Sequence, residues 1–450
     1  MTTNEMPNNI FSRALIPVIA GSIIGSLLIV DVYTRFFAIV IASILLIFSY
    51  LFQRPVALSL KWMLFVVFFV PFQFFDFLNI FKVFNPLIIL GLIACIKLLH
   101  HAWAGPKAQE TRVVLIDRLY LLFLVSALVS SYRAISFLGA LNWLFYSVVT
   151  GYVGYRAILT LTLEEIKGLL KFLVLVSCVS AIYGFGEFLT GYSLIYGRSV
   201  QGRLSSLLGH PIASGLVFAT ILPFSLALYL ETKEKRYILS SAILFLTVIL
   251  TFARGSWLAL TIGLFFMFSF LRFQLKLKLL LTLIILASFF ALLPSVTQSI
   301  INRFHQNETG RYSSLNIRKE AIHIASSIIR DRPWFGVGPF NASRYREKYT
   351  IDVNLKELSF ENTYLGLLVN LGFVGMGIIS FLFIAILKIS VFSLWKHNLF
   401  NIYRIAAIAS FMILVINAGT FNLDTYRLLH FLVWFSIGLN ISISKKYGNE

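Results

Sequence analysis

The sequence predicts an all-α polytopic membrane protein. Three observations carry this prediction: the composition, the long apolar runs and the placement of the basic residues. Of the 450 residues, 58% are hydrophobic and 13% are charged, and the mean hydropathy is +0.85. Soluble domains carry about 25% charged residues, so a water-soluble enzyme is excluded. The apolar runs lack a period of two, which favours helices over a membrane β-barrel.

The apolar runs are long enough to cross a bilayer. A transmembrane helix needs about 20 predominantly apolar residues, and about 12–14 stretches of this chain meet that requirement. In chain order the candidate spans are residues 14–30, 36–52, 60–78, 84–99, 116–131, 137–155, 166–189, 211–230, 237–252, 256–271, 277–294, 363–387, 403–420 and 428–443.

The basic residues set the expected orientation. The net charge is +19, from 38 Lys and Arg against 19 Asp and Glu. Basic residues concentrate in short cytoplasmic loops. When the N-terminus is placed inside and the helices alternate, most Lys and Arg fall in inside loops, as Lys233, Lys235 and Arg236 do. We therefore expect both termini in the cytoplasm and a large external loop, and the charge does not imply nucleic acid.

The spans divide the chain into four parts. Residues 1–190 are expected to form N-terminal transmembrane helices, and 191–294 core transmembrane helices with external loops that contain arginine. Residues 295–362 are expected to form a large external loop subdomain, and 363–450 the C-terminal transmembrane helices. Cys95 and Cys178 both lie in apolar runs, which indicates neither a disulfide framework nor a thiolate metal site.

The large external loop has its own helical pattern. Apolar residues recur at helical spacing from Ile317 to Ile328, which predicts an amphipathic helix over 316–330. Pro333 should end it, because proline neither continues a helix nor lets the preceding residue stay helical comfortably. A turn over 336–339 and a short helix over 342–349 should follow.

Three motifs lie at the expected outer membrane boundary. They are residues 201–211 (QGRLSSLLGHP), residues 251–257 (TFARGSW) and residues 359–365 (SFENTYL). Each carries charged or polar side chains next to an apolar span. The topology places Arg203, Arg254 and Glu361 near that boundary, where they could form one site.

The two arginines suit a phosphate group. A guanidinium keeps its charge and offers a planar fork of donors that can hold phosphate bidentately. Gly202 and Gly255 flank Arg203 and Arg254 and allow close backbone approach. The alternative is that each arginine only anchors the membrane surface. His210, just before a proline, could contact phosphate or simply line the interface.

Glu361 is the candidate catalytic residue. It could act as a general base that takes a proton from a sugar hydroxyl; alternatively, it only complements the dipole of the helix that follows. Asn362 could cap that helix or orient a substrate, and Tyr364 is a further candidate substrate contact. Arg318 and Arg332 in the external loop are also candidates, with a solvated face as the alternative.

The sequence lacks the motifs of metal-dependent, nucleotide-binding and dinucleotide-binding enzymes. The sequence contains no H-E-x-x-H metal motif, no Walker A loop and no dinucleotide fingerprint. We therefore expect neither a metal nor another cofactor.

Residues 195–440 resemble the O-antigen ligase / O-antigen polymerase family, which includes Wzy-type bacterial polysaccharide polymerases. The resemblance is carried by Arg203 with residues 209–211 (GHP) and by the turn at residues 251–255 (TFARG). Residues 332–338 (RPWFGVG), 361–365 (ENTYL) and 371–375 (LGFVG) complete the set. The order, spacing and sidedness of these pieces make the combination more specific than any one of them.

The resemblance implies a GT-C-type glycosyltransferase in the bacterial inner membrane, with its active site on the periplasmic side. The family transfers glycan from undecaprenyl pyrophosphate. Its pyrophosphate-binding arginines match Arg203 and Arg254. The ligases carry a histidine where this chain has Glu361, so the Glu-Asn pair favours the polymerase branch. One base and one displacement predict inversion at the anomeric carbon.

The alternatives differ in acceptor or in class. An O-antigen ligase would transfer the glycan to lipid A-core or to a protein. A lipid-linked glycan transporter would place charges near mid-membrane, whereas here Asp76 and Glu187 are only partial exceptions; a membrane scaffold is a weaker alternative. The expected partners are the lipid-linked donor, a glycan or lipid-linked acceptor, membrane lipids, and a chain-length regulator or other polysaccharide-assembly proteins.

Overall fold

The computed structural model confirms the all-α class over the residues that it describes. These are residues 56–69, 114–132, 134–144, 148, 150–193, 198–199, 202–271, 314–339, 341–349, 360–396, 402–421 and 427–446. The predicted spans 14–30, 36–52, 84–99 and 277–294 lie outside them.

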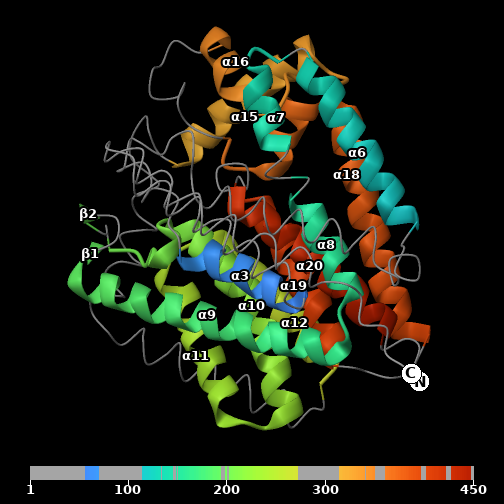
Figure 1. The fold of residues 1–450 in the computed structure, drawn as a ribbon. Coiled ribbons are helices and arrows are strands. Elements are labelled where there is room, and N and C mark those ends of the chain that lie inside the picture. The colour runs from blue at the N-terminus through green and yellow to red at the C-terminus, as the bar shows by residue number, and fades with distance from the viewer. Residues whose placement is uncertain are drawn as a thin grey trace, which may run out of the picture.

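The helices follow the predicted spans closely (Figure 1). The N-terminal helices are α3 (Val56–Phe69), α6 (Val114–Tyr132), α7 (Phe137–Trp143), α8 (Thr150–Thr160) and α9 (Leu163–Thr190). The central ones are α10 (Pro211–Thr232), α11 (Lys235–Leu250) and α12 (Arg254–Ser269). The remaining ones are α15 (Ser314–Asp331), α16 (Ala342–Tyr349), α18 (Thr363–Lys396), α19 (Ile402–Ala418) and α20 (Arg427–Lys446). A 3-10 turn at Ser206–Leu208 and a two-residue antiparallel pair, β1 (Tyr192–Ser193) with β2 (Arg198–Ser199), complete the described elements.

Four of the described helices are long and apolar enough to cross a membrane. They are Leu115–Tyr132, Leu163–Thr190, Pro211–Thr232 and Thr363–Val391. Shorter apolar helices occur at Arg254–Ser269, Ile402–Ala418 and Leu432–Ile443. The protein is therefore a membrane protein with several apolar helices, as the composition predicts.

Within the predicted span 137–155 the described residues are helical, with two α-helices and π-helical geometry at Leu144 and Val148 between them. Ser136 starts α7, with its side chain accepting a hydrogen bond from the Gly139 backbone N–H, and α7 ends at Trp143. The second helix, α8, begins at Thr150. Its Gly151 lies so close to Trp434 that an added Cβ would come within 2.1 Å of the indole ring, so the position of α8 is fixed by tertiary packing.

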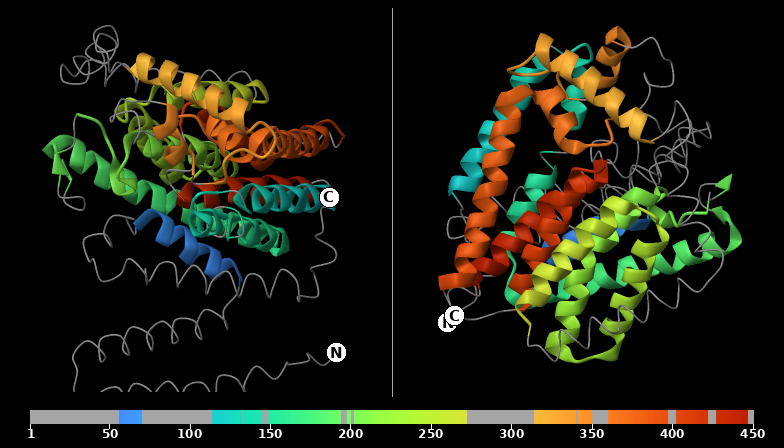
Figure 2. Two further views of the ribbon diagram at one scale, coloured as in Figure 1. Left: turned by 90° about the horizontal axis from the view of Figure 1, so that it is seen from above. Right: turned by 180° about the vertical axis from the view of Figure 1, so that it is seen from behind.

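Helix α10 is the axis of the bundle (Figures 1 and 2). Its side chains are buried from Ala213 to Leu228 among those of α9, α11, α12 and α19. Small residues permit this packing, since an added Cβ at Gly215 would come within 2.8 Å of the Ser256 hydroxyl on α12. Small residues at such contacts are typical of packed membrane helices.

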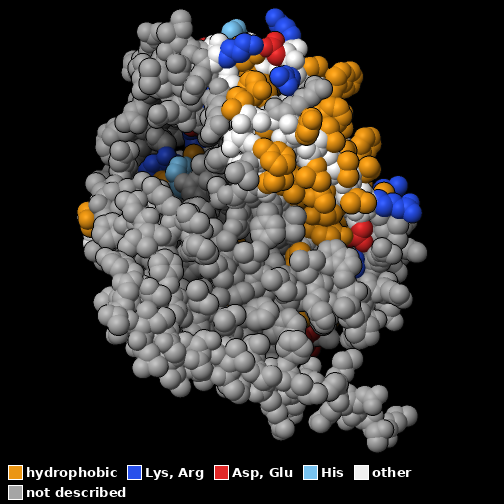
Figure 3. Space-filling view, turned by 45° about the horizontal axis from the view of Figure 1, so that its top comes forward, with side chains coloured by type: hydrophobic (Ala, Val, Ile, Leu, Met, Phe, Trp, Pro, Cys, Tyr) orange, Lys and Arg blue, Asp and Glu red, His pale blue; other side chains and the backbone are white. Residues whose placement is uncertain are grey.

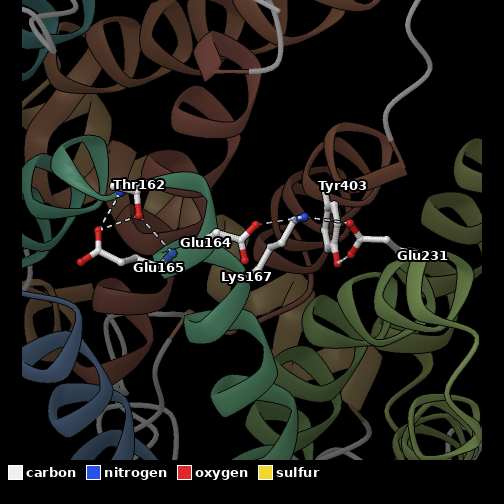
Figure 4. A network of polar contacts seen from close by, with 6 residues as sticks. All are labelled: Thr162, Glu164, Glu165, Lys167, Glu231 and Tyr403. Atoms are coloured by element: carbon white, nitrogen blue, oxygen red, sulfur yellow. Dashed lines mark hydrogen bonds and ion pairs between the residues drawn. The ribbon is translucent and has the colours of Figure 1, made fainter.

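One end of α10 is closed by a polar network (Figure 4). Lys167 of α9 lies 2.8 Å from Glu231 and 3.5 Å from Glu164. The Tyr403 hydroxyl of α19 also donates to Glu231. Because the first turn of α9 and the first turn of α19 both meet the last turn of α10, both helices run antiparallel to α10.

Helices α6 and α18 pack side by side at the edge of the bundle (Figure 1). The outer face of α6 exposes large apolar side chains, among them Leu121, Leu122, Val125 and Val129. The space-filling view shows a continuous apolar band on one side of the molecule (Figure 3). Contiguous exposed apolar patches mark a membrane or protein contact. Because α6 is long and apolar enough to cross a membrane, a lipid-facing surface suits it.

The predicted loop subdomain contains both expected helices. The helix predicted over 316–330 is observed as α15 (Ser314–Asp331), and the one predicted over 342–349 is α16 with those bounds. They enclose a small core that includes Ile324, Ile328, Val337 and Phe360. Outside this core, Asp331 accepts hydrogen bonds from Lys348 and Tyr349, which joins the end of α15 to the end of α16.

Helix α18 is broken at Gly372, and the loop after α15 fills the break. Gly372 has φ 66° and ψ −169°. The Phe373 and Val374 backbone N–H groups donate to the carbonyls of Pro333 and Trp334, at 2.8 and 3.1 Å. In return, the Val337 N–H donates to the Val369 carbonyl at 3.0 Å. The two glycine-containing motifs thus satisfy each other's backbone groups, which a helix break would otherwise leave unpaired.

Candidate functional site

The segment that follows α19 brings the predicted motifs together. The Thr363 N–H and hydroxyl both donate to the Phe421 carbonyl, at 3.1 and 2.6 Å. The His210 ring lies 5.7 Å from the Phe421 ring. An added Cβ at Gly255 would come within 2.1 Å of the Thr420 hydroxyl oxygen. Three motifs far apart in sequence therefore meet at residues 420–421.

Arg254 lies at the start of a helix rather than inside a tight turn. It is the first residue of α12, Ala253 is the N-cap, and the side chain is exposed. The first backbone N–H groups of a helix lack intrahelical partners and favour anions. Arg254 and these N–H groups can therefore act on the same negative charge. The contact of Gly255 with Thr420 explains why a glycine follows the arginine.

Arg203 lies beside the end of α11 and is half-buried. Its Nε donates to the Thr251 carbonyl at 2.9 Å, and the Leu204 N–H donates to the Leu250 carbonyl at 3.0 Å. These bonds join the 201–211 motif to the 251–257 motif.

His210 is the N-cap residue of α10, and its carbonyl accepts from the Ser214 N–H at 3.0 Å. Pro211 occupies the first helical position, where the lack of an N–H costs nothing. The half-buried ring faces Phe421. His210 therefore lines the same end of the bundle as Arg254.

Glu361 forms an ion pair with Arg318 of α15, with 3.2 Å between Oε2 and Nε. The two side chains are about equally half-exposed, at 38% and 42%. Glu361 has φ 38°, which is uncommon for a residue with a side chain. This backbone conformation and the ion pair together fix the direction of the carboxylate.

Asn362 caps α18. Its side-chain oxygen accepts from the Leu365 N–H at 3.0 Å, which is the standard contact of an N-cap asparagine. Of the two roles that the sequence left open, the structure contains the cap. Glu361 directly precedes this N-cap residue, so the cap helps to fix its backbone position.

Tyr364 and Arg332 contact other parts of the protein. The Tyr364 hydroxyl donates to the Val415 carbonyl of α19 at 2.5 Å. The Arg332 guanidinium lies 6.0 Å from the Tyr345 ring centroid of α16. Tyr364 therefore ties α18 to α19, and Arg332 packs the loop subdomain together.

Sequence reasoning missed Asn417, Thr420 and Phe421. The Ser256 hydroxyl donates to the Asn417 side-chain oxygen at 3.2 Å, and the Thr420 hydroxyl lies 3.4 Å from the same atom. A signal was present, because Asn417 is a buried amide near the end of an apolar span. Arg346 of α16 was also missed, although a basic residue with 1% exposure stands out once burial is known.

The described residues contain no group of three or more His, Cys, Asp or Glu side chains arranged to hold a metal ion. The charged groups of the site are instead Arg203, Arg254, Arg318 and Glu361. Such a set can bind an anion and accept a proton.

Residues 239–380 match the family model described as O-antigen ligase. The matched segment includes Arg254, Arg318, Arg332 and the 361–365 motif, whereas Arg203 and His210 precede it. A search of curated proteins found no match. The family supports a glycosyltransferase-like role in polysaccharide assembly. The resemblance predicted from the motifs is thus confirmed over residues 239–380, which are similar to the O-antigen ligase family.

Proposed function

We propose that the protein is a polymerase of lipid-linked bacterial surface polysaccharide. It transfers glycan from an undecaprenyl-pyrophosphate donor to a sugar hydroxyl of an acceptor glycan. The reaction needs no metal and inverts the anomeric carbon. The supporting observation is the meeting of the Arg254, His210 and Glu361 motifs at residues 420–421.

The arginines act on the leaving group. Arg203 and Arg254 bind the pyrophosphate and stabilise its charge as the bond between the anomeric carbon and the phosphate oxygen breaks. The electron pair leaves with undecaprenyl pyrophosphate. The first N–H groups of α12 add to this stabilisation, because they point toward the same end of the helix as Arg254.

Glu361 acts on the acceptor. Its carboxylate takes the proton of the acceptor hydroxyl while that oxygen forms the new bond to the anomeric carbon. Arg318 holds the carboxylate before the acceptor arrives. The acceptor hydroxyl then approaches the oxygen atom that Arg318 does not contact.

The proposed location is the bacterial inner membrane, with both termini cytoplasmic and the site on the periplasmic side. Cysteine labelling of intact cells tests this topology in a background without native cysteines. Lys319→Cys on α15 should react with an impermeant reagent from outside. Lys235→Cys before α11 should react only after the cells are opened. The opposite labelling pattern would overturn the topology.

The ligase is the second candidate, because the matching family model carries that description. The two functions differ in product. Purified protein in liposomes, supplied with undecaprenyl-pyrophosphate repeat units, should produce a ladder of longer lipid-linked chains. Transfer to lipid A-core or to a protein without growth of the lipid-linked chain would instead identify a ligase.

A transporter is less well supported. Glu187, one of the two acidic residues that could have lined a mid-membrane path, lies in the last turn of α9. Its carboxylate accepts a hydrogen bond from Ser193 just beyond the helix. A carboxylate at a helix end beside a short turn suits a structural role.

A further inference from the structure

Arg346 on α16 is a buried cation with no hydrogen-bond partner. Its side chain is 1% exposed. Nε and both terminal nitrogens are buried, and none has a hydrogen-bond partner among the residues that the structure describes. Burial of an unpaired charge is strongly unfavourable. Such a group calls for an explanation, and an anionic ligand would supply the missing partners.

The charge of Arg346 persists at neutral pH. Burial lowers the pKa of Arg346 to about 10, which still leaves the guanidinium protonated. Its central carbon lies 4.9 Å from the Phe360 ring centroid. A ring partially compensates a cation through its face, but it accepts none of the five N–H bonds that a guanidinium offers.

Two acidic side chains of the described subdomain are already engaged. Glu361, next to Phe360 in the chain, pairs with Arg318. Asp331 accepts from Lys348 and Tyr349. Neither carboxylate therefore serves as the counter-charge of Arg346.

We propose that Arg346 forms a subsite for an anionic group of the acceptor glycan, either a sugar carboxylate or a phosphate. The proposal rests on the proposed function, in which Glu361 receives the acceptor hydroxyl. Phe360 links the two positions, because it touches Arg346 and directly precedes Glu361. An acceptor whose hydroxyl reaches Glu361 would place the substituent of a neighbouring sugar at Arg346.

Occupation of this subsite requires a local shift of the Phe360–Glu361 segment, since the guanidinium is covered. The anion then meets the free edge of the guanidinium, where two parallel N–H groups match a carboxylate or phosphate. Lysine would keep the charge but not this fork. Arg346→Lys should therefore bind the anion more weakly.

Thermal unfolding of the purified full-length protein tests the subsite without any transfer reaction. The probes are sodium glucuronate and sodium phosphate, each compared with sodium chloride of the same ionic strength, with neutral glucose as the sugar control. An anion that binds the subsite, supplied at about ten times its Kd, should raise the Tm of the native protein by about 1–2 °C. Glucose should leave it unchanged. A response to glucuronate alone identifies a carboxylate subsite, and a response to phosphate alone a phosphate subsite.

Arg346→Gln should lose the shift, and Arg346→Lys should need at least a tenfold higher anion concentration. Arg330→Gln is the matched control, because Arg330 is an exposed arginine in the last turn of α15, and it should respond like the native protein. No anion shift in the native protein, or an equal shift in Arg346→Gln, would overturn the proposal. If Arg346→Gln does not fold, the native protein and Arg346→Lys still decide it.

The two proposals can fail separately. If Glu361→Gln retains full transfer while the anion shift depends on Arg346, the proposed mechanism fails and the subsite remains. If transfer depends on Glu361 while the anion shift is independent of Arg346, only the subsite fails.

Discussion

The two ends of α10 differ in the contacts that their charged side chains make. At the Glu231 end, Lys167, Glu231 and Tyr403 contact one another and close the bundle (Figure 4). At the His210 end, the elements around residues 420–421 carry the exposed Arg254 and the half-buried Arg203. Exposed basic side chains occur at both ends, since Lys233, Lys235 and Arg236 flank the Glu231 end. The difference is the network, in which the Glu231 carboxylate contacts both Lys167 and Tyr403. We propose that the arginines of the His210 end bind an anionic ligand and that the network at the Glu231 end contributes to stability.

The length of α10 separates these two regions across the membrane. Its 22 residues rise about 33 Å at about 1.5 Å per residue, close to the thickness of the hydrocarbon core, about 30 Å. The ends are therefore expected at opposite membrane surfaces. Substitution of a charged residue at the His210 end should therefore lower the transfer rate, whereas substitution of one at the Glu231 end should affect only stability.

Removal of the proposed base should have the largest effect. Glu361→Gln keeps the shape but cannot take the acceptor proton, so the transfer rate should fall by about 10²–10⁴-fold. The initial rate of chain growth in liposomes measures this. The variant should insert and unfold like the native protein. A rate within threefold of the native value would remove Glu361 from the mechanism.

Removal of a proposed pyrophosphate contact should have the next largest effect. Arg254→Ala should lower the rate about 10²–10³-fold, because the leaving charge loses a fixed donor. Arg254→Lys should recover only part of the loss, since lysine lacks the planar fork. Arg236→Ala, an exposed arginine at the Glu231 end, is the matched control and should keep normal rates. Equal losses for Arg236 and Arg254 would erase the contrast between the ends.

The break in α18 should be sensitive to a single methyl group. At Gly372 an added Cβ would come within 2.4 Å of the Trp334 carbonyl, and φ is 66°. Gly372→Ala should therefore destabilise the protein by about 1–3 kcal/mol or more. Gly377→Ala is the control within the same helix, because nothing lies within 4 Å of its added Cβ. Denaturation midpoints should fall for Gly372→Ala and stay level or rise for Gly377→Ala.

The closed end should tolerate substitution with a modest loss of stability. Glu231→Gln weakens its contact with Lys167, whose partly exposed ion pair contributes about 1 kcal/mol or less after screening by solvent. The melting temperature should fall by a few degrees or less, with the transfer rate unchanged. A large loss of activity without unfolding would show that this end also takes part in function.

The smallest effect concerns the exposed contact between α15 and α16. Hydrogen bonds from Tyr349 and Lys348 lower the pKa of Asp331. A lowered folded-state pKa means that the contact contributes above the unfolded pKa of aspartate and is lost as the pH falls through the folded value. Hydrogen exchange of α16, measured relative to its intrinsic rate at each pH, should therefore become faster in acid for the native protein. In Asp331→Asn it should already be faster at neutral pH, and identical exchange in both proteins would show that the contact contributes nothing.

Local patterns predicted the local structure well. The apolar spacing from Ile317 to Ile328 gave α15 to within two residues, and the bounds of α16 were correct. These elements depend on neighbours in the sequence, so periodicity and proline placement suffice. The expected external motifs also proved to lie on elements that meet.

Long-range packing was beyond such patterns. Nothing local shows that Gly255 contacts Thr420, or that Gly372 breaks α18 to accept the loop at Trp334, because each depends on a partner distant in sequence. The close packing of Gly151 on Trp434 similarly depends on a distant partner. Arg346 looked like any basic residue of a short polar helix until the fold buried it.

The most direct test compares the two ends of α10 in a single assay. Native protein, Glu361→Gln and Glu231→Gln are reconstituted separately, given undecaprenyl-pyrophosphate repeat units, and their lipid-linked products are separated by length. We expect a ladder of longer chains from the native protein and from Glu231→Gln, and none from Glu361→Gln. A full ladder from Glu361→Gln, or its loss from a folded Glu231→Gln, would contradict the assignment of the active site to the His210 end.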